Sequence, residues 1–259
     1  MPRFAANLAY MFADRPPIER FGAAAAAGFK AVELQFPYEQ APSDIRTEIA
    51  RHGLVQLGIN TQQRPNGGEA GLGAVPGRGR EFAEVFGRAL DYVVAIGGTA
   101  IHTMAGVVAP EQRPAAERTF LENYARAADL AAEKNITVLI EPLNPRDRPH
   151  YFVSRVEQAA DLIDKVGRKN LRIQFDFYHV QITSGDLLTR LEKFLPLIGH
   201  VQIAAVPSRA EPDEGEVNYP ALFDALDRLG YQGWVGCEYK PRGRTEDGLG
   251  WGRRYGLGA

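Results

Sequence analysis

The chain has 259 residues, of which 45% are hydrophobic and 24% are charged, and its formal net charge is -2. This length accommodates one large α/β domain or two ordinary ones, and the apolar fraction suffices for a sizeable core. The net charge is close to zero and no cluster of basic residues stands out, so the sequence gives no electrostatic reason to expect binding to nucleic acid.

Short apolar runs alternate with longer segments of helical periodicity along the whole chain. The expected strands are Arg3–Leu8, Ala31–Phe36, Val55–Asn60, Ala100–Met104, Thr137–Glu141, Leu171–Asp176, His200–Ile203 and Trp234–Tyr239. The expected helices are Ile18–Ala27, Ser43–His52, Arg80–Ile96, Pro114–Lys134, Ser154–Val166, Asp186–Phe194 and Ala221–Leu229. Most of these helices stop at a glycine, which suits a helix C-terminal cap with positive φ.

Strands that alternate with helices are typical of βαβ units and a parallel sheet. Eight such repeats in about 250 residues predict a single α/β domain, a (β/α)8 TIM barrel that spans residues 1–259. Two connections, Thr61–Arg78 and Ala204–Tyr219, are longer than this barrel requires and are expected to be functional lids or disordered. From about residue 242 the chain is a tail rich in Gly and Arg, and we expect its last few residues to be loose.

Several strands carry one polar face, whereas strands of a fully parallel sheet are normally apolar on both faces. In the run 171–176 every second residue is apolar, and the residues between are Arg172, Gln174 and Asp176. The apolar face must pack against the helices, so the polar face points into the barrel. The carboxyl ends of the strands, where such barrels have their active sites, then present Asn7, Glu33, Asn60, His102, Glu141, Asp176, Gln202 and Glu238.

The last four strands each supply one member of a candidate metal site: Glu141, Asp176, Gln202 and Glu238. Three carboxylates and an amide this close repel one another unless something neutralises them. An all-oxygen set fits a hard divalent cation, Mg²⁺ or Mn²⁺, with Co²⁺ as a third option, and fits zinc less well. The alternative is a buried polar network with counter-charges from Arg172, His200 and Lys240.

The most specific segments are Ile-Glu-Pro-Leu-Asn at 140–144, Gln-Phe-Asp-Phe-Tyr-His at 174–179, Gly-His-Val-Gln-Ile-Ala at 199–204 and Gly-Trp-Val-Gly-Cys-Glu-Tyr-Lys-Pro at 233–241. They resemble the hydroxypyruvate isomerase family of the xylose-isomerase-like barrels, and the resemblance covers nearly the whole chain. The segments 205–219 and 237–251 look most like its 2-oxo-tetronate isomerase branch. Residues 60–69 depart from the family's usual Asn-x-x-x-Gly-Asp pattern, which leaves substrate specificity open.

The resemblance implies roles for individual residues. The four candidate ligands would bind the metal, and Glu141 and Glu238 would also donate and accept protons. His179 and Arg209 match positions that hold substrate oxygens in related isomerases and epimerases. Arg209 would pair with a substrate carboxylate through its fork of donors, or else with Glu211 or Glu214 at the surface. Further candidate substrate contacts are Asn7, Glu33, His102 and Lys240.

The implied activity is that of a metal-dependent isomerase without an organic cofactor. It would move the carbonyl group of a small 2-oxo-3-hydroxy acid, hydroxypyruvate or a 2-oxo-tetronate, through a cis-enediolate. A ketose 3-epimerase is the first alternative, although Gln202 stands where that group usually has a metal-binding histidine. A phosphodiester-cleaving barrel would need several metals and many histidines, and this chain has five. A non-catalytic sugar-acid-binding barrel is disfavoured because both Glu141 and Glu238 are present.

The single cysteine, Cys237, excludes an intramolecular disulfide and fits a reducing compartment. The N-terminus lacks an apolar signal core, and no run of about 18 apolar residues occurs. We therefore expect a cytoplasmic protein without a membrane span. The expected partner is a small-molecule substrate, and the resemblance implies a homo-oligomer, either a dimer or a tetramer.

Overall fold

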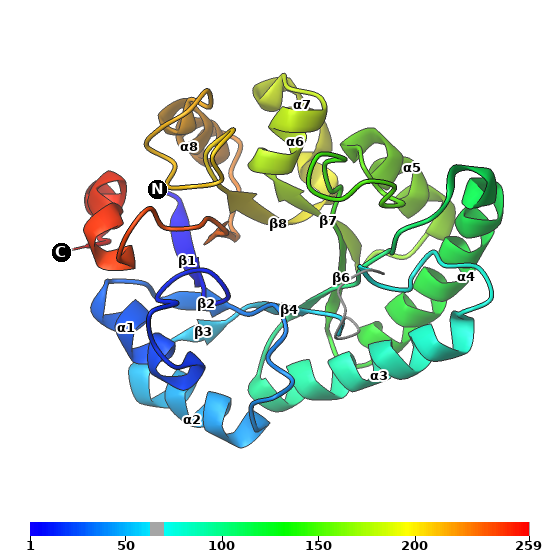
Figure 1. Cartoon of the computed structure of the whole chain (residues 1–259), viewed down its shortest axis with the longest axis horizontal. Coiled ribbons are helices and arrows are strands. Elements are labelled where there is room, and N and C mark those ends of the chain that lie inside the picture. The colour runs from blue at the N-terminus through cyan, green and yellow to red at the C-terminus, as the bar shows by residue number, and fades with distance from the viewer. Residues whose placement is uncertain (63–69, 259) are drawn as a thin grey trace.

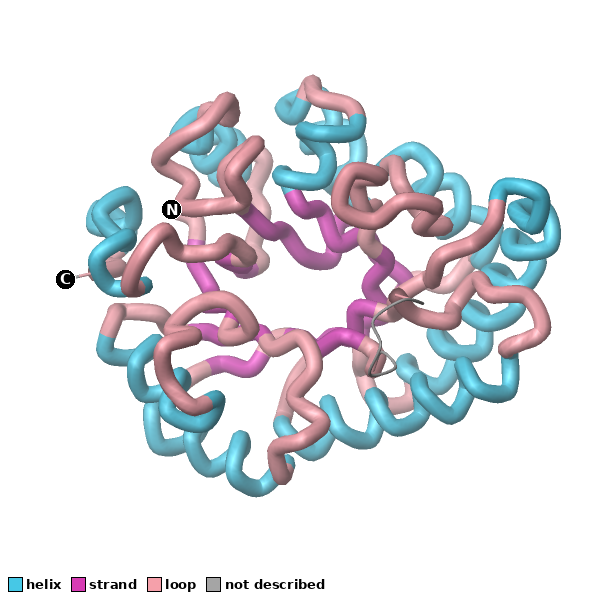
Figure 2. The backbone as a smooth tube through the Cα atoms, in the orientation of Figure 1, coloured by secondary structure: helices cyan, strands magenta, loops and turns pink. Residues whose placement is uncertain are grey.

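A computed structural model of the chain describes residues 1–62 and 70–258. Parallel strands form a ring in the centre and helices surround it (Figure 1). Figure 2 shows the same arrangement, with the strands on the inside and the helices outside. This is the (β/α)8 barrel that the alternation of strands and helices predicted. Within the described ranges, no helix has the length and apolar character that crossing a membrane requires.

The barrel strands are short, and their order around the sheet follows the chain. They are β1 (Arg3–Asn7), β2 (Ala31–Glu33), β3 (Val55–Gln56), β4 (Gly58–Asn60), β5 (Ala100–His102), β6 (Thr137–Ile140), β7 (Leu171–Asp176), β8 (Ile198–Ile203) and β9 (Trp234–Cys237). In the described part of the chain the order is β3-β2-β1-β9-β8-β7-β6-β5-β4, and neighbouring strands pair in parallel.

The ring closes within the third predicted strand, which is divided at Leu57. β3 pairs with β2, whereas β4 pairs with β5. The backbone N–H of Leu57 donates to Val32 O at 2.9 Å, and Leu57 O accepts from Thr99 N at 2.7 Å. One residue thus links two neighbours, so the nine strands of the described ranges occupy eight barrel positions.

Most of the surrounding helices correspond to predicted ones. They are α1 (Arg20–Ala26), α2 (Pro42–His52), α3 (Gly79–Ile96), α4 (Arg113–Ala132), α5 (Val156–Val166), α7 (Leu187–Phe194) and α8 (Tyr219–Arg228). α2, α3 and α5 end at Gly53, Gly97 and Gly167, whose φ angles of 62°, 77° and 67° are left-handed. The glycines therefore act as the predicted C-terminal caps, because glycine adopts this region at little cost.

One helix, α6 (Phe177–Thr183), was not predicted. It begins directly after β7, and Asp176 caps it, since the backbone N–H of Tyr178 donates to Asp176 Oδ1 at 2.9 Å. A side-chain oxygen at this position satisfies one of the unpaired N–H groups of the first turn. The cap uses one carboxylate oxygen of Asp176 and leaves the other available to the barrel mouth.

Two long segments are better structured than the sequence indicated. The connection Ala204–Tyr219 folds back on itself, with Ala205 N donating to Ala210 O at 3.0 Å. In the tail, Thr245–Tyr255 forms 3-10 turns and Trp251 packs edge-on against Phe4 with ring centroids 5.1 Å apart. Gly258 N donates to Ala27 O at 2.9 Å, so the expectation of a loose end is wrong up to this residue. Of the connection Thr61–Arg78, residues 63–69 lie outside the described ranges.

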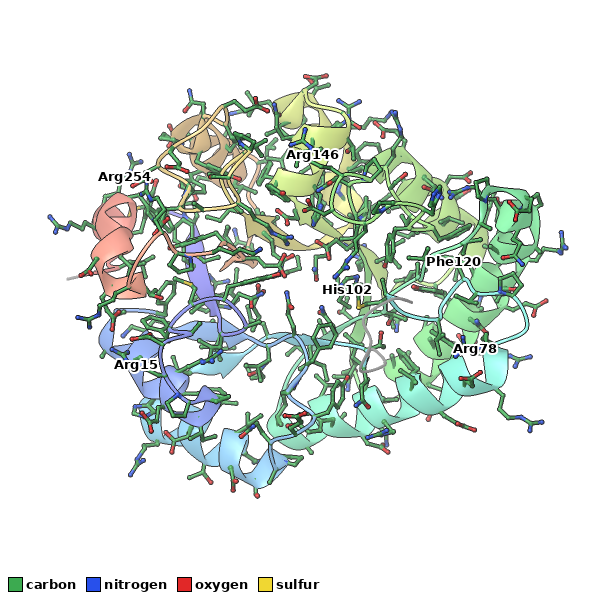
Figure 3. The ribbon with its side chains drawn as sticks, viewed as in Figure 1. Arg15, Arg78, His102, Phe120, Arg146 and Arg254 are labelled. Atoms are coloured by element: carbon green, nitrogen blue, oxygen red, sulfur yellow. The ribbon has the colours of Figure 1, made fainter. Side chains whose placement is uncertain are left out.

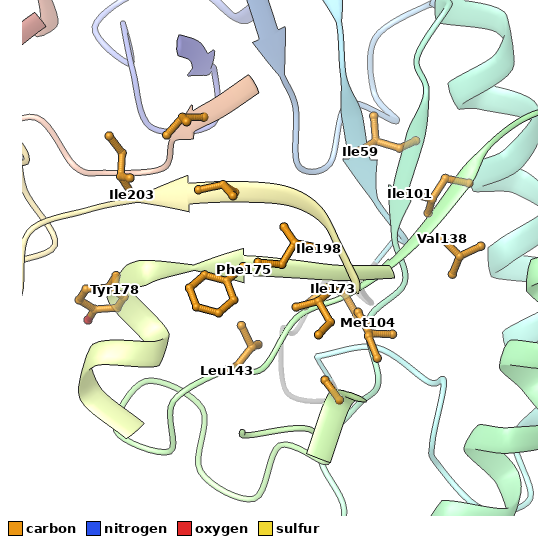
Figure 4. Close-up of a cluster of buried hydrophobic side chains, with 14 of the residues drawn as sticks. Ile59, Ile101, Met104, Val138, Leu143, Ile173, Phe175, Tyr178, Ile198 and Ile203 are labelled. Carbon is orange, nitrogen blue, oxygen red and sulfur yellow. The ribbon is translucent and has the colours of Figure 1, made fainter. Parts of the chain in front are cut away.

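The two faces of the strands separate an apolar layer from a polar one, as the alternation predicted. Ile101, Val138 and Ile173, on neighbouring strands, are completely buried, and Figure 4 shows them within a hydrophobic cluster. Burial of such a side chain stabilises the fold by roughly 1.5–3 kcal/mol. The opposite faces bury polar residues such as Gln174 and Gln202 inside the barrel. The apolar layer therefore fixes which side chains reach the barrel interior, where Figure 3 labels His102.

Candidate active site

Carboxylates gather where the last strands of the barrel end. Glu141 follows β6, Asp176 ends β7, Glu238 follows β9, and His179 lies near the start of α6. One candidate ligand atom from each of these four residues lies within 4.8 Å of the others, and all four side chains are buried. The structure thus brings together three of the predicted metal ligands and one of the predicted substrate contacts.

Glu141, Asp176 and Gln202 each have one side-chain atom hydrogen-bonded and one oxygen left over. Gln174 Nε2 donates to Glu141 Oε2 at 3.0 Å, the first turn of α6 donates to Asp176 Oδ1, and Gln202 Nε2 donates to Glu33 Oε1 at 2.8 Å. The other three oxygens are buried and find no hydrogen-bond partner among the described residues. A buried acceptor without a partner is costly, so these oxygens fit a bound hard cation.

Glu238 differs, because both of its oxygens already accept hydrogen bonds. Gln35 Nε2 donates to Glu238 Oε1 at 2.6 Å, and Asn7 Nδ2 lies 3.3 Å from the same oxygen. Arg209 Nη2 donates to Glu238 Oε2 at 2.9 Å. These donors fix the carboxylate at the edge of the cluster, where it can still share an oxygen with a cation or a substrate.

His179 presents an N–H group to the carboxylates. The backbone N–H of Asn144 donates to His179 Nδ1 at 3.1 Å, so this nitrogen is the acceptor of a neutral imidazole. The Asn144 amide is oriented by Asp147 N, which donates to Asn144 Oδ1 at 2.9 Å and thereby leaves Nδ2 facing His179 Nδ1 at 2.7 Å. The proton is therefore on Nε2, 3.7 Å from Glu141 Oε1 and Asp176 Oδ2. In this tautomer Nε2 is a hydrogen-bond donor available to a ligand oxygen, and it does not ligate a metal.

Burial and mutual repulsion raise the pKa values of the three carboxyl groups. Desolvation is the larger cause for Glu141, followed by the charges of Glu238 and Asp176. Burial, with repulsion from Glu238, raises the pKa of Asp176 to about 7. Burial also raises the pKa of Glu238, although the Arg209 guanidinium opposes this shift. Near neutral pH the metal-free cluster therefore retains protons that a divalent cation would displace.

We expect Asp176→Asn to stabilise the metal-free protein, and to do so more at pH 8 than at pH 5. The pKa of this carboxyl rises from 3.8 to about 7 on folding, so the folded state holds a proton that the unfolded state has released. The free energy of unfolding of the wild type then falls as the pH rises from about 4 to about 7. At about 1.4 kcal/mol per pKa unit, the effect reaches up to about 4 kcal/mol. Asn keeps the oxygen that caps α6 and lacks this titration.

Melting temperatures of the two proteins in a strong chelator, measured from pH 5 to pH 8, test this expectation. The buried histidines oppose the carboxyl contribution, but they are common to both proteins and cancel in the difference. A difference in melting temperature that does not grow with pH would contradict the raised pKa of Asp176. Addition of Mn²⁺ should stabilise the wild type more than the variant and so reverse the order.

Three of the four residues of the cluster, Glu141, His179 and Glu238, line an open cleft of about 410 Å³ at the carboxyl ends of the strands, whereas Asp176 is buried and does not line it. Small-molecule sites are commonly clefts of roughly 300–1,000 Å³. Of the predicted site residues, His102, Glu141, His179, Arg209, Glu238 and Lys240 line this cleft. Sequence reasoning missed Tyr10, Gln35, Asp147, Arg148, Tyr178 and Ser208, which also line it. Tyr10, Asp147, Arg148 and Ser208 belong to connecting segments without a periodic pattern. Tyr178 lies in the unpredicted helix α6, and Gln35 lies on the polar face of the predicted strand Ala31–Phe36 but was not assigned to the site.

Asn7, Glu33 and Gln202 line a second cavity of about 210 Å³, deeper in the barrel. There His200 Nε2 donates to Glu33 Oε2 at 2.6 Å. Burial opposes the ionisation of Glu33, but His200 and the neighbouring amides hold its pKa below the ordinary value. The polar-network alternative is thus seen at Glu33 and His200. Its other proposed counter-charges, Arg172 and Lys240, form no ion pair with any described residue.

Arg209 lines the cleft together with Tyr10 and Tyr178, whose ring centroids are 5.6 Å and 4.9 Å from its Cζ. Besides its bond to Glu238, its Nη1 lies 3.4 Å from Asp147 Oδ2. The surface pairing considered for Arg209 does not occur, because Arg242 takes Glu211 and Glu214 instead. The φ angle of Arg209 is 57°, a conformation that non-glycine residues keep where the surroundings impose it, often at functional sites.

Comparison with known proteins gives consistent matches over nearly the full length. A family model described as xylose isomerase-like TIM barrel matches residues 21–255. The chain is 49% identical to a 2-oxo-tetronate isomerase of Cupriavidus necator over 98% of this chain and 99% of that protein. It is 39% identical to a hydroxypyruvate isomerase of Escherichia coli, covering 97% and 98%. The crystal structure of a Brucella melitensis protein named as an AP endonuclease of family 2 superposes with a TM-score of 0.96 at 48% identity, covering 98% and 99%.

Proposed function

The chain belongs to the xylose isomerase-like TIM barrels and is an isomerase, and from this premise we propose that it moves the carbonyl group of a small 2-oxo-3-hydroxy acid to the neighbouring carbon. Hydroxypyruvate and the 2-oxo-tetronates are the proposed substrates. The observation that supports this most is the group of buried oxygens on Glu141, Asp176 and Gln202 that lack hydrogen-bond partners among the described residues. They lie at the carboxyl ends of adjacent strands, where barrels of this kind bind substrates.

We assign Glu141, Asp176, Gln202 and Glu238 to a divalent cation, Mg²⁺ or Mn²⁺. When bound, such a cation would stabilise the negative charge that develops on neighbouring substrate oxygens. The direction of the His179 Nε2–H group supports an all-oxygen set, and oxygen ligands favour these hard cations over zinc. The raised pKa values of Glu141 and Asp176 also support the assignment, because carboxyl groups that hold protons without a cation would release them when a cation binds.

The two glutamates move the protons in this proposal. One glutamate removes the proton from carbon 3, and the electrons of the broken C–H bond form the carbon–carbon double bond of a cis-enediolate. The carbonyl oxygen on carbon 2 takes the negative charge. A glutamate then delivers a proton to carbon 2, while the hydroxyl proton passes from the oxygen on carbon 3 to the negatively charged oxygen on carbon 2. Carbon 3 thereby becomes the new carbonyl, and carbon 2 carries the hydroxyl group. Carboxyl groups with raised pKa values suit both directions of transfer near neutral pH.

Other cleft residues hold the substrate in this proposal. His179 Nε2–H donates to a substrate oxygen, and His102, whose ring nitrogens have no hydrogen-bond partner among the described residues, lines the same cleft. Arg209 Nε also lacks such a partner, so donors of its guanidinium are available to a carboxylate. Lys240 is exposed at the rim and adds a positive charge. These cations support an anionic substrate over a neutral ketose.

Three alternatives have less support. A ketose 3-epimerase shares the fold, but Gln202 stands where the resemblance places a metal-binding histidine. Nuclease activity, for which the Brucella melitensis protein is named, would require several metals, whereas the acidic cluster found among the described residues contains one histidine, and its N–H faces the carboxylates. A non-catalytic sugar-acid-binding barrel would not need two buried glutamates with raised pKa values.

The proposal is tested by proton NMR of hydroxypyruvate and of 2-oxo-tetronates incubated with the enzyme and Mn²⁺ or Mg²⁺. We expect tartronate semialdehyde from hydroxypyruvate, or the 3-oxo isomer from a 2-oxo-tetronate. Neutral ketoses of similar size serve as the control for the role of the substrate carboxylate. If the ketoses are converted faster than the oxo acids, the assigned substrate class is wrong, and an inverted configuration at carbon 3 would identify an epimerase.

A further inference from the structure

In the cavity deeper in the barrel, the buried carboxylate of Glu33 accepts a hydrogen bond from the side-chain amide of Gln202. We infer that Glu33 is a positioning residue that holds the Gln202 amide with its oxygen toward the cluster, and that Gly236 provides the space in which Glu33 does so. This inference rests on the proposed function, because it gives a reason for the orientation of one assigned ligand. It also gives Glu33 a task other than the substrate contact expected from the sequence.

Three donors hold the carboxylate of Glu33, which does not line the cleft. Its Oε1 accepts from Gln202 Nε2 and from Asn7 Nδ2, both at 2.8 Å, and its Oε2 accepts from His200 Nε2 at 2.6 Å. Glu33 is 4% exposed and lines the deeper cavity, not the cleft. A carboxylate that accepts from three donors is held in one position, so it can fix the orientation of a neighbouring amide.

An ionised carboxylate only accepts hydrogen bonds, and this property sets the direction of the Gln202 amide. The oxygen and nitrogen of a glutamine side chain have nearly the same shape, so the surrounding donors and acceptors decide which way it is turned. Because the Glu33 carboxylate can only accept, the NH₂ group of Gln202 faces it. Gln202 Oε1 therefore faces away from Glu33, and it has no hydrogen-bond partner among the described residues. The reverse orientation would put N–H donors where Gln202 Oε1 now lies, and Gln202 stands beside Asp176 in the strand register.

Gly236 is the second part of the arrangement. It lies in β9, directly beside Gln202 of β8 in the strand register. A Cβ atom added at Gly236 would lie 2.5 Å from Glu33 Oε2 and 2.6 Å from Glu33 Oε1. Such distances are far below van der Waals contact, so the Glu33 carboxylate occupies the volume that a side chain at position 236 would fill. The need for glycine here is one of space, because its φ is not in the left-handed region.

Gly236→Ala therefore tests the inference without removing a polar group. The carboxylate is the end of a flexible side chain, so it should move away from the new methyl group while the barrel backbone stays in place. We expect Gly236→Ala and Glu33→Met to weaken Mn²⁺ binding by about 10- to 100-fold, as the loss of a partner that orients a ligand typically does. Glu33→Gln should keep most of the affinity, since its amide oxygen can still accept from Gln202 Nε2.

Isothermal titration of metal-free protein with Mn²⁺ measures these affinities, and melting in a chelator verifies that each variant is folded. Gly87→Ala in α3 is the matched control, because a Cβ there meets no atom of the described residues within 4 Å, its own helix backbone aside. Wild-type binding that is unchanged in Gly236→Ala and Glu33→Met would overturn the inference and leave the proposed function standing. A loss in Glu33→Gln as large as in Glu33→Met would overturn it as well, because charge rather than orientation would then matter. Absence of Mn²⁺ binding by the wild type would overturn the proposed function together with the inference.

Discussion

A strong chelator is expected to abolish turnover, and Mn²⁺, Mg²⁺ or Co²⁺ to restore it. Glu141, Asp176 and Glu238 place carboxyl oxygens within 4.8 Å of one another in a buried site. Without a cation these groups retain protons, as their raised pKa values indicate. A protonated cluster neither stabilises a developing negative charge on the substrate nor offers a carboxylate base. Loss of the cation should therefore remove both functions of the site at once.

The variant Asp176→Ala tests in the same experiment whether Asp176 is a ligand of the cation. It removes one charged oxygen from the cluster and should weaken Mn²⁺ binding and turnover together, with turnover partly recovered at high Mn²⁺ concentration. Asp129→Ala is the control, because Asp129 pairs with Arg168 on the surface at 2.6 Å, and a surface ion pair is worth roughly 0–1 kcal/mol. Full activity of the metal-free wild type would refute a metal-dependent mechanism. Unchanged Mn²⁺ affinity in Asp176→Ala would show that the cation binds elsewhere.

The fold was readable from the sequence because its signals are local and repeated. Each strand with its following helix has its own hydrophobic period and often a glycine cap, so the barrel was predicted before any contact was known. α6 was missed because Phe177–Thr183 is short and rich in β-branched and aromatic residues. Its start depends on Asp176 acting as a cap, while the preceding residues of the same run form β7. The division of a strand at Leu57 arises from closure of the ring, which no local pattern encodes.

The site was readable in part for the same reason. A period of two tells which residues face the barrel interior, and this identified Glu141, Asp176, Gln202 and Glu238. The period does not tell how deep along the barrel axis a side chain lies. Glu33 was therefore expected beside a substrate, whereas its carboxylate lies in the deeper cavity. The roles of His179 and Arg209 came from the resemblance, and the partners that orient them, Asn144 and Asp147 among others, follow only from three-dimensional contacts.

Glu141→Gln and Glu238→Gln are expected to lower turnover by at least about 100-fold while weakening Mn²⁺ binding much less. Glutamine keeps an oxygen and nearly the same shape, but it lacks the basic carboxylate that general acid–base catalysis requires. Metal binding should decline only in part, because two carboxylates remain. Glu157→Gln is the matched control, since Glu157 pairs with Arg190 on the surface at 3.0 Å, and its substitution should leave both quantities unchanged.

Exchange of substrate hydrogen with deuterated water separates the two glutamates. Replacement of the glutamate that abstracts the proton should abolish exchange at carbon 3, because no enediolate forms. Replacement of the other should permit exchange while blocking product, because the enediolate forms and returns to substrate. The structure gives the two groups different surroundings: Glu141 Oε1 has no hydrogen-bond partner among the described residues, whereas both oxygens of Glu238 accept bonds, one of them from Arg209.

This difference predicts which glutamate is the base. A carboxylate that accepts from a guanidinium is a weaker base than one that accepts only from a neutral amide, so Glu141 should abstract the proton and Glu238 should return it. Exchange at carbon 3 is then lost in Glu141→Gln and retained in Glu238→Gln, with Mn²⁺ occupancy confirmed in both. Loss of exchange in Glu238→Gln and its retention in Glu141→Gln would show instead that Glu238 is the base. Equal retention of exchange and turnover in both variants would show that the glutamates act as ligands only, and His179, the one histidine of the cluster, would then be the next base to test.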